Sequence, residues 1–474
     1  MQLLFLAIGH LCTWNKPMLA LDHTALPEKL NVLCRKIRQA GGDAWLVGGC
    51  VRDLILGIQP KDFDLEVYGL KPDALKATLG EVGKTEFVGR HFGVFKLWAG
   101  ELEIDVAMPR SESKSSSGHR GFDIEIDPNL PPEQACLRRD FTINAIMFDP
   151  LRHQILDFHH GIKDIKNKTL RHVSNAFCED PLRPLRGMQF AARFRLKLAH
   201  ETAAFCKGML AEADALSPAR IWGEWQKWSH AAYPSFGLQA LKESGWIQCY
   251  PQLQALVGCP QSPRWHPEGD VWNHTLQVCD QAAEIAGNNE LDERATAYLL
   301  FSALCHDFGK PACTEINDSG NITSPGHSEA GIAPTTHFLH SIGAPGRLNE
   351  YILPLVLDHI THLHGEPTPR AVRRLAHRLE PANIELWEML VEADASGRAP
   401  APPSRPAFAW LQQARALNHH QAAPRAIVTG KLLLKLAIAE PGPQMGAILK
   451  KAYAAQLEGK FDDMQSAIAW LKSQ

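Results

Sequence analysis

A glycine pair followed by two closely spaced aspartates is the feature that most constrains this chain of 474 residues. Gly48 and Gly49 follow a short apolar run, and Asp62 and Asp64 begin a run that alternates through Tyr68. Side chains at positions i and i+2 of a strand project from one face, so the two carboxylates are expected side by side. Carboxylates that close repel each other, and a hard cation such as Mg²⁺ relieves the repulsion. The pattern therefore predicts a metal site at the start of a strand.

Groups suited to phosphate surround this motif. Residues 44–47 are predicted to form a buried strand, and residues 51–56 a short helix after the glycine pair. The glycines allow backbone N–H groups to approach a triphosphate, and Arg52 adds a forked donor. Asp105, in the alternating run 101–107, is expected to supply a third carboxylate from a neighbouring strand. An Asp-x-Asp pair alone is common by chance, but this combination indicates metal-assisted nucleotidyl transfer.

A second segment, residues 138–145, offers groups for a nucleotide. Arg139 can pair with a phosphate, while Asp140 and Asn144 offer an acceptor and a donor for ribose hydroxyls. The alternative is an ion-pair cluster at the surface, which contributes little energy. Apolar residues within the segment indicate that it is anchored in the core. The polar residues are then expected at the opening of the binding site.

A third segment begins at Asp180, which is predicted to cap a helix that has Pro181 in its first position. Arg183 and Arg186 are three residues apart and so share a face of that helix. A guanidinium and a carboxylate together can present donors and acceptors to the edge of a base. A capped helix with two solvated arginines is the alternative.

These three segments, 48–64, 138–145 and 179–186, resemble in order the motifs of bacterial tRNA nucleotidyltransferases, the CCA-adding enzymes, in the class shared with bacterial poly(A) polymerases. The resemblance implies template-independent addition of CCA to tRNA 3′ ends from CTP and ATP, by a two-metal mechanism. It also implies that Asp180 and Arg183 act as a protein template for the incoming base. The implied catalytic residues are Asp62, Asp64 and Asp105, with Mg²⁺ on the first two; the implied nucleotide-binding residues are Gly49, Arg52, Arg139, Asp140, Asn144, Asp180, Arg183 and Arg186.

A polar segment rich in serine and glycine, residues 110–121, separates Asp105 from the second motif. Such a composition cannot bury itself, so a mobile loop is expected. In the family, a loop at this place helps to switch from adding C to adding A, and Arg110 and Glu112 match its pattern. A plain connection is the alternative.

The second half of the chain carries a different set of polar residues on predicted helices. Imidazole and carboxylate groups are standard ligands for transition-type divalent metals, and helices can project them into one cavity. The chain has 22 histidines, so chance matches have to be considered, but the adjacent pair His306-Asp307 is harder to dismiss. The order of these residues resembles the HD superfamily of metal-dependent phosphohydrolases. The implied ligands of Ni²⁺, Mn²⁺ or a similar ion are His274, His306, Asp307 and Asp394, with His327 and His359 as ligands of a second ion.

The resemblance implies substrates such as 2′,3′-cyclic phosphates, 2′-nucleotides or damaged tRNA ends, among which the sequence does not choose. The whole chain is then expected to be an α+β protein: a mixed-sheet nucleotidyltransferase head, an all-α neck, an all-α HD domain and a helical tail. The expected boundaries are 20–165 for the head, 166–255 for the neck, 256–398 for the HD domain and 399–474 for the tail. We expect residues 1–17 to be an extension or a start-site artefact, with translation then starting at Met18.

Composition and net charge indicate which partners and which cellular location to expect. The net charge is only −3, so an RNA-binding surface has to be local. The 11 cysteines are odd in number and scattered, which indicates reduced thiols and a cytoplasmic location. No apolar run is long enough to span a bilayer. We expect tRNA, ATP and CTP as partners, no membrane, and a monomer or homodimer.

Three other functions remain open at this stage. A poly(A) polymerase shares every motif of the head, and an enzyme that adds only CC or only A does too. An HD phosphohydrolase whose head only binds RNA is an alternative of another class, which the intact head acids argue against.

Overall fold

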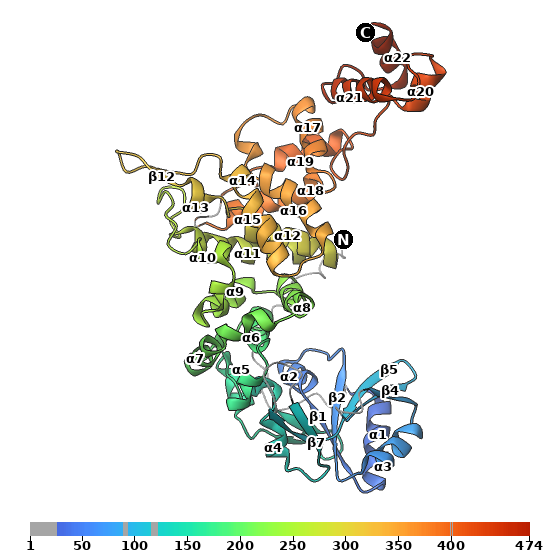
Figure 1. Ribbon diagram of the computed structural model, residues 1–474, viewed down its shortest axis with the longest axis vertical. Helices are drawn as coiled ribbons and strands as arrows, with labels where there is room; N and C mark the ends of the chain where they lie inside the picture. Colours follow the sequence, from blue (N-terminus) through green and yellow to red (C-terminus); the bar gives the residue numbers. More distant parts are fainter. Residues whose placement is uncertain (1–25, 89–92, 115–121, 399, 401) are drawn as a thin grey trace, which may run out of the picture. The chain divides into compact units, whose positions relative to one another are not determined.

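The computed structural model describes residues 26–88, 93–114, 122–398, 400 and 402–474. The chain divides into two compact units, Met1–Asp180 and Pro181–Gln474. The first contains a mixed sheet with flanking helices, and the second is almost entirely helical (Figure 1). The predicted α+β class is therefore confirmed.

A seven-stranded sheet organises the first unit, in the order β3-β4-β5-β2-β1-β8-β9. Strands β2 and β5 are parallel, and the other neighbouring pairs are antiparallel. The strands are β1 (Asp43–Val47), β2 (Phe63–Tyr68), β3 (Lys84–Val88), β4 (Val94–Ala99), β5 (Leu102–Ala107), β8 (Met147–Asp149) and β9 (Gln154–Leu156).

Further short elements complete this unit. The helical segments are α1 (Glu28–Gln39), α2 (Gly49–Leu56), α3 (Pro72–Gly80), α4 (Pro132–Cys136), α5 (Gly161–Lys166), η2 (Thr142–Asn144) and η3 (Asn175–Glu179). The remaining strands are β6 (Arg110–Lys114), β7 (Phe122–Ile126) and β10 (Thr169–Leu170), of which β6 and β7 form a hairpin.

The strand, glycine turn and helix expected around residue 48 are all present. The β1 strand runs into Gly48, which has φ +75° and links it to α2. The helix ends at Gly57, whose left-handed conformation (φ +72°) is one that glycine adopts readily. The short connection leaves β1 and β2 to pair antiparallel, with Val47 opposite Asp64.

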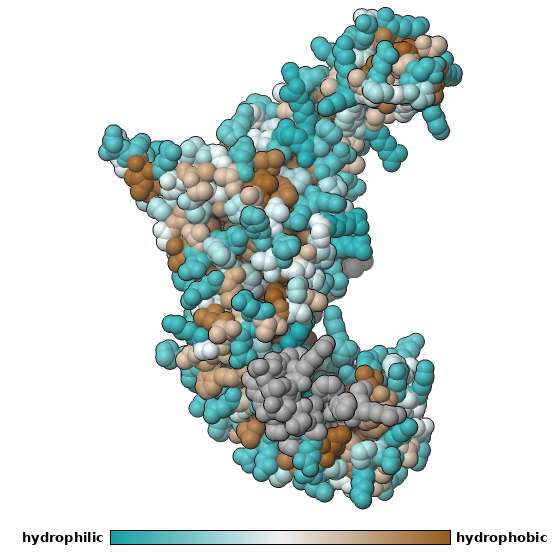
Figure 2. Space-filling model, viewed as in Figure 1, coloured by the Kyte–Doolittle hydropathy of each residue, from teal (hydrophilic) through white to brown (hydrophobic). Residues whose placement is uncertain are grey.

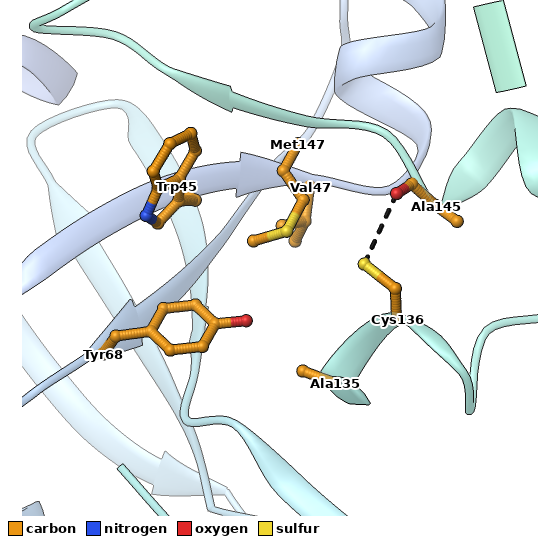
Figure 3. Packing of buried hydrophobic residues seen from close by; sticks show 7 residues of the cluster. All are labelled: Trp45, Val47, Tyr68, Ala135, Cys136, Ala145 and Met147. Carbon is orange, nitrogen blue, oxygen red and sulfur yellow. Dashed lines mark hydrogen bonds between the residues drawn. The ribbon is translucent and has the colours of Figure 1, made fainter. Parts of the chain in front are cut away.

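The two faces of the sheet differ in character. Leu46, Leu65 and Ile104 are fully buried, and α1 packs against β1 and α3. On the other face an apolar cluster joins the sheet to α4, and Cys136 Sγ of this cluster donates to Ala145 O at 3.4 Å (Figure 3). The buried members of the cluster are Trp45, Val47, Tyr68, Ala135, Cys136, Ala145 and Met147. Because residues opposite each other share a face, Asp64 lies on this second face beside Val47.

The second unit is built from helices α6 to α22. A large aromatic group lies in its core, where Trp225 and Trp228 are fully buried. Its longer helices are α6 (Arg183–Phe194), α7 (His200–Gly208), α8 (Pro218–Ser229), α9 (Pro234–Glu243), α11 (Val271–Asn288), α12 (Glu293–Cys305), α15 (Ile332–Ser341), α16 (Gly346–Asp358), α17 (Pro369–Leu379), α18 (Ile384–Ser396), α19 (Phe408–Ala416), α21 (Pro443–Leu457) and α22 (Met464–Lys472).

Short elements connect these helices. They are α10 (Pro251–Gln254), α13 (Lys310–Cys313), α14 (His327–Ala330), α20 (Gly430–Lys435), η4 (Leu210–Ala215), η5 (Trp246–Cys249), η6 (Thr361–Leu363), β11 (Lys197–Leu198), β12 (Glu315–Ile316) and β13 (Ile322–Thr323). The last helices have a small core of their own, which includes Leu433, Ala452 and Phe461. Across the described ranges, no helix combines the length and apolar character needed to cross a membrane.

Candidate functional site

Three carboxylates meet at the edge of β2 and β5. Asp64 is the second residue of β2, and the parallel register sets it opposite Asp105 of β5. Asp62 lies just before β2 rather than in it, two residues from Asp64. The register thus brings the third predicted acid next to the other two, as the alternation of residues 101–107 suggested.

The charges of these carboxylates are only partly balanced. The pKa of Asp64 is raised to about 6, mainly by burial, with Arg139 lowering it and the charges of Asp105 and Asp62 adding to the increase. Lys96 Nζ lies 3.7 Å from Asp105 Oδ1. That oxygen is buried and accepts no hydrogen bond from the described residues. A group of hard oxygen ligands with excess negative charge and an unpartnered oxygen fits Mg²⁺.

Gly48 gives close access to these acids. A Cβ atom at this position would lie 3.3 Å from Asp64 Oδ2 and 3.5 Å from Arg139 Nη1. Its positive φ also disfavours any other residue. Gly49, the predicted nucleotide contact, is the first residue of α2, so its N–H belongs to a helix N-terminus beside the acids. The backbone at Gly48 therefore leaves space directly above the Asp64 carboxylate.

Arg52 is buried and points into a polar network rather than to open solvent. Its Nη1 donates to Asn144 Oδ1 at 2.7 Å, and its Nη2 and Nε donate to Asp53 Oδ1 at 2.7 and 2.9 Å. Asn144 Nδ2 in turn donates to Asp140 Oδ1 at 3.0 Å. Arg52, the predicted forked donor for a triphosphate, makes these bonds within the protein and so orients Asn144. The three predicted nucleotide-binding residues Arg52, Asp140 and Asn144 are thus brought together.

Glu66 is a charged residue that the sequence interpretation did not assign to the site. It is fully buried in β2, and its carboxylate lies 2.8 Å from Arg139 Nη2 and 3.1 Å from Arg138 Nη2. Burial would raise its pKa, but the two arginines outweigh burial and hold the pKa below its ordinary value. The signal was present in the alternation of Asp62, Asp64 and Glu66, which puts all three on one face.

The third segment differs from its expected form. Helix α6 begins at Arg183 with Leu182 in the preceding position, so Asp180 does not cap it. Asp180 instead ends η3 in an extended conformation. The later start is compatible with Pro184, because backbone N–H groups of the first helical turn lack a partner within the helix. The boundary between the two units falls directly after Asp180, while Arg186 lies over the ring of Phe190 at 5.3 Å.

The polar segment after Asp105 is also different from the expectation. Arg110 and Glu112 lie in strand β6, where they are opposite Ile126 and Ile124 of β7. Backbone pairing with the apolar-rich β7 explains why this part of a serine-rich segment forms a strand and not a loop. The rest of the predicted loop, residues 115–121, lies outside the described residues.

The second unit brings all six predicted metal ligands into one cluster. They come from separate helices or helix ends: His274 from α11, His306 and Asp307 after α12, His327 from α14, His359 after α16 and Asp394 from α18. The shortest links are His274 Nε2 to Asp394 Oδ1 at 3.0 Å and His306 Nε2 to Asp307 Oδ2 at 3.2 Å. His327 Nε2 lies 3.6 Å from Asp307 Oδ1. Among these six residues, two groups of three have ligand atoms mutually within 4.8 Å, namely His274, His306 and Asp394, and Asp307, His327 and His359.

Backbone carbonyls orient three of these imidazoles in the same way. The Nδ1 atoms of His306, His327 and His359 lie 2.8, 2.8 and 2.6 Å from the carbonyl oxygens of Ala303, Ser324 and Val356. A carbonyl only accepts, so each Nδ1 carries a proton and each ring directs its Nε2 toward the centre. This is the arrangement that metal-binding histidines show.

A bound cation would explain two features at the centre of the cluster, a close contact between two imidazoles and a buried imidazole nitrogen without a hydrogen-bond partner. The Nε2 atoms of His327 and His359 are 3.2 Å apart, although neither carries a proton when both Nδ1 atoms donate. His306 Nε2 is buried and has no hydrogen-bond partner among the described residues. Burial and the neighbouring His306 lower the pKa of His359 to about 3, so its ring stays neutral. The donor set of imidazoles and carboxylates therefore fits one or two transition-type divalent ions.

Glu268 contacts the Nδ1 side of His274, opposite the ring nitrogen that faces Asp394, and the sequence did not predict this contact. Its Oε1 lies 2.8 Å from His274 Nδ1 and 2.9 Å from His266 Nδ1. A carboxylate behind a metal-binding histidine fixes the orientation of the ring and raises its basicity. Burial opposes the charge of Glu268, but the two imidazoles lower its pKa to about 2. No motif in the proline-rich stretch around it indicates this role, because the contact depends on how the loop folds back onto α11.

A cavity of about 510 Å³ opens onto the cluster. Four ligands line it, namely Asp307, His327, His359 and Asp394, and two cationic side chains, Lys310 and Arg398, line it as well. Lys310 Nζ lies 2.7 Å from Asp307 Oδ2. The volume of the cavity is within the range of small-molecule sites. Its metal ligands and cationic side chains suit a phosphate ester.

Comparison with known proteins agrees with this geometry. The family model described as the poly A polymerase head domain matches residues 44–171, which contain the three acids and the second motif. The chain is 35% identical over 366 residues to the multifunctional CCA protein of Aliivibrio salmonicida, covering 75% of this chain and 85% of that protein. It is 34% identical over 425 residues to the multifunctional CCA protein of Xanthomonas campestris pv. campestris, covering 87% and 97%.

Solved structures share the fold. The CCA-adding enzyme of Bacillus stearothermophilus in complex with CTP aligns with a TM-score of 0.62 and 21% identity, covering 94% of this chain and 96% of that chain. The Thermotoga maritima CCA-adding enzyme complexed with tRNA aligns with a TM-score of 0.59 and 17% identity, covering 94% and 96%. The arrangement of a mixed-sheet unit followed by a helical unit is thus found in known enzymes.

Proposed function

The chain belongs to the family of multifunctional CCA proteins, and we propose that it adds CCA to the 3′ end of tRNA, using CTP and ATP. The observation that carries the proposal is the parallel register of β2 and β5, which groups Asp64 with Asp105 and Asp62. The relatives named multifunctional CCA proteins and the match to a poly A polymerase head domain support the same reaction class. The substrates are then tRNA, CTP and ATP, and the reaction takes place without a nucleic acid template.

Asp62, Asp64 and Asp105 are the residues that would hold Mg²⁺. When bound, the ions lower the pKa of the tRNA 3′-hydroxyl and neutralise the departing pyrophosphate. Asp64 is central to this set because it is opposite Asp105, two residues after Asp62 and beside Gly48. The space above Gly48 and the first N–H groups of α2 receive the triphosphate. No side chain has to form a covalent intermediate.

The other polar residues have positioning roles in this proposal. Arg139, held by Glu66 beside Asp64, faces the triphosphate with its remaining surface. Arg52 orients Asn144, and through it Asp140, for the ribose hydroxyls. Asp180 and Arg183 present the base-reading edge, and Arg186 assists nucleotide binding, with Phe190 supporting its guanidinium.

Glu112 and Arg110 keep the role implied by the family, as residues that help the change from C to A addition. Their place in β6 puts this role on a hairpin. Strand pairing fixes their spacing along the backbone, so we expect the hairpin to act as a unit.

We propose a second activity, hydrolysis of phosphate esters, for the metal-ligand cluster of the second unit. The imidazoles and acids around His306 and Asp307 would hold Ni²⁺, Mn²⁺ or a similar ion, which would supply an activated water when bound. Lys310 and Arg398 provide positive charge for the phosphate. This cluster favours the CCA-adding assignment over a poly(A) polymerase, and 2′,3′-cyclic phosphates and 2′-nucleotides are the substrates to test.

Incubation of tRNA lacking its 3′ end with labelled CTP and ATP, separately and together, tests the first activity. CCA addition predicts two C residues and then one A. A long tail from ATP alone would instead identify a poly(A) polymerase, and addition of only CC or only A would identify a partial activity. Asp64→Asn is expected to abolish incorporation, whereas Glu101→Gln, an exposed acid in the turn before β5, should leave it unchanged.

Hydrolysis of adenosine 2′,3′-cyclic phosphate and of adenosine 2′-phosphate in the presence of Ni²⁺ or Mn²⁺ tests the second activity. His306→Ala should abolish hydrolysis and leave CCA addition intact, and His337→Ala, an exposed histidine of α15, is the matched control. Hydrolysis without any nucleotide incorporation would support the rival in which the first unit only binds RNA.

A further inference from the structure

Large apolar side chains surround the mouth of the cavity in the second unit. Trp265 and Leu363 line the cavity and are 56% and 68% exposed. Ile316, in the β12–β13 hairpin, is 61% exposed and pairs with Ile322, which also lines the cavity. These are the three most exposed large apolar side chains of the described residues. Figure 2 shows hydrophobic atoms close to the tip of this hairpin, beneath a hydrophilic end.

The same cavity is also lined by charged and polar side chains that are little exposed, and we call this part its floor. Asp307, Lys310 and His327 are 2%, 12% and 13% exposed there, and Arg398 lines the cavity as well. An apolar ligand such as a lipid chain would have to desolvate these charges, at a large cost. A ligand with a charged phosphate at one end and a flat apolar group at the other matches both parts of the cavity.

Trp265 is held in place by its loop. Its backbone N–H donates to Ser262 O at 3.0 Å, and the loop is closed by the bond from Val271 N to Cys259 O at 3.0 Å. Gln261 anchors the loop to the floor, because its Oε1 accepts from Lys310 Nζ at 2.7 Å. An exposed indole on a fixed loop loses little conformational entropy when it binds a ligand.

The surface of Trp265 that remains exposed is suited to a nucleobase. The Arg264 guanidinium lies over the ring at 4.9 Å and adds positive charge to the rim. Aromatic rings bind bases of every kind by stacking, and a nearby arginine adds to the interaction. A base at the rim places its ribose phosphate toward Lys310 and the metal ligands.

We propose that the rim of this cavity, with Trp265 at its centre, binds the base of a nucleotide whose ribose phosphate lies at the floor. The inference rests on the proposed phosphohydrolase function and makes Trp265 a specificity-determining residue of that site. The nucleoside phosphates are those of the proposed function, and the inference adds that the base is bound as well as the phosphate. Phosphate esters without a base bind only the floor.

The test compares adenosine 2′-phosphate with glycerol 2-phosphate, which has the same secondary phosphate ester and no base. Trp265→Ala should raise KM for adenosine 2′-phosphate about tenfold, equivalent to about 1.4 kcal/mol, and leave glycerol 2-phosphate nearly unchanged. Trp265→Phe should restore most of the preference. Phe408→Ala is the matched control, because Phe408 is also exposed and covered by an arginine, Arg405 at 5.2 Å, but does not line the cavity.

Equal losses for the two substrates in Trp265→Ala, or a wild-type protein without preference for the nucleotide, would overturn the inference. Calorimetric binding of adenosine 2′-phosphate to the full-length protein loaded with Mn²⁺ separates it from the proposed function. If neither ester is hydrolysed, the phosphohydrolase proposal fails. Weaker binding by Trp265→Ala would still support the base contact, and equal or absent binding would refute it.

Discussion

Replacing Glu66 with glutamine tests whether one buried carboxylate holds Arg138 and Arg139 beside the acidic site. Glutamine keeps the size of the side chain and removes its charge, so two guanidinium groups that are 20% and 15% exposed lose their counter-ion. Removing one partner of a buried ion pair costs about 3–5 kcal/mol. The glutamine carbonyl still accepts a hydrogen bond and water reaches the arginines, so we expect about 3 kcal/mol, the lower end of that range.

Hydrogen–deuterium exchange of the full-length protein measures this effect locally. A loss of about 3 kcal/mol accelerates exchange of the β2 amides on the order of a hundredfold when they exchange by local opening. Peptides from α21 serve as an internal reference, because they belong to the other compact unit. Glu101→Gln, which changes an exposed carboxylate, should not alter exchange of β2.

The effect of Glu66 should also depend on pH. Its pKa is lowered in the folded protein by Arg139 and Arg138 against the effect of burial. A carboxylate with a lowered pKa stabilises the folded state above its unfolded pKa and loses this contribution as the pH falls through the folded value. The difference between wild type and Glu66→Gln is therefore largest at neutral pH and shrinks in acid. A β2 exchange rate in Glu66→Gln within about threefold of wild type at neutral pH would refute the reasoning.

Three other predictions follow from particular contacts. Gly48→Ala should reduce the kcat of nucleotide addition at least about tenfold, because the added Cβ lies against Asp64 and Arg139. Gly57→Ala is the control, because Gly57 has a similar positive φ but no atom within 4 Å of an added Cβ. It should lower the free energy of unfolding by about 1–2 kcal/mol and leave kcat unchanged. Asn144→Ala should lower the free energy of unfolding by about 1–3 kcal/mol, measured by denaturant titration, because Arg52 Nη1 loses a buried acceptor, and unchanged stability would contradict the network. Removal of divalent ions with a chelator should lower the melting temperature of wild type, and His306→Ala should show a smaller decrease if the cluster binds metal.

The pattern of residues predicted the main parts of both centres. The alternation of residues 62–68 and the glycine pair follow from local geometry, because strand period and positive φ are properties of neighbouring residues. The helical positions of His274 and Asp394 were also predicted, whereas His306 lies directly after the end of α12. Two local expectations were wrong: Asp180 does not cap α6, and Arg110 and Glu112 lie in a strand. Both errors concern the boundaries of secondary-structure elements. A nearby proline or pairing with another strand determines where such an element begins.

By itself the sequence determined which residues carry charge, where glycine allows close approach, and which side chains share a face of one element. Only the tertiary structure decided the register that sets Asp105 opposite Asp64, the contacts of Arg52 and Arg139 with Asn144 and Glu66, and the place of Glu268 behind His274. The physical reason is that strand register and helix packing are set by burial of apolar surface over the whole unit. Contacts between charges that are far apart along the chain are a consequence of that packing, and no local pattern encodes them.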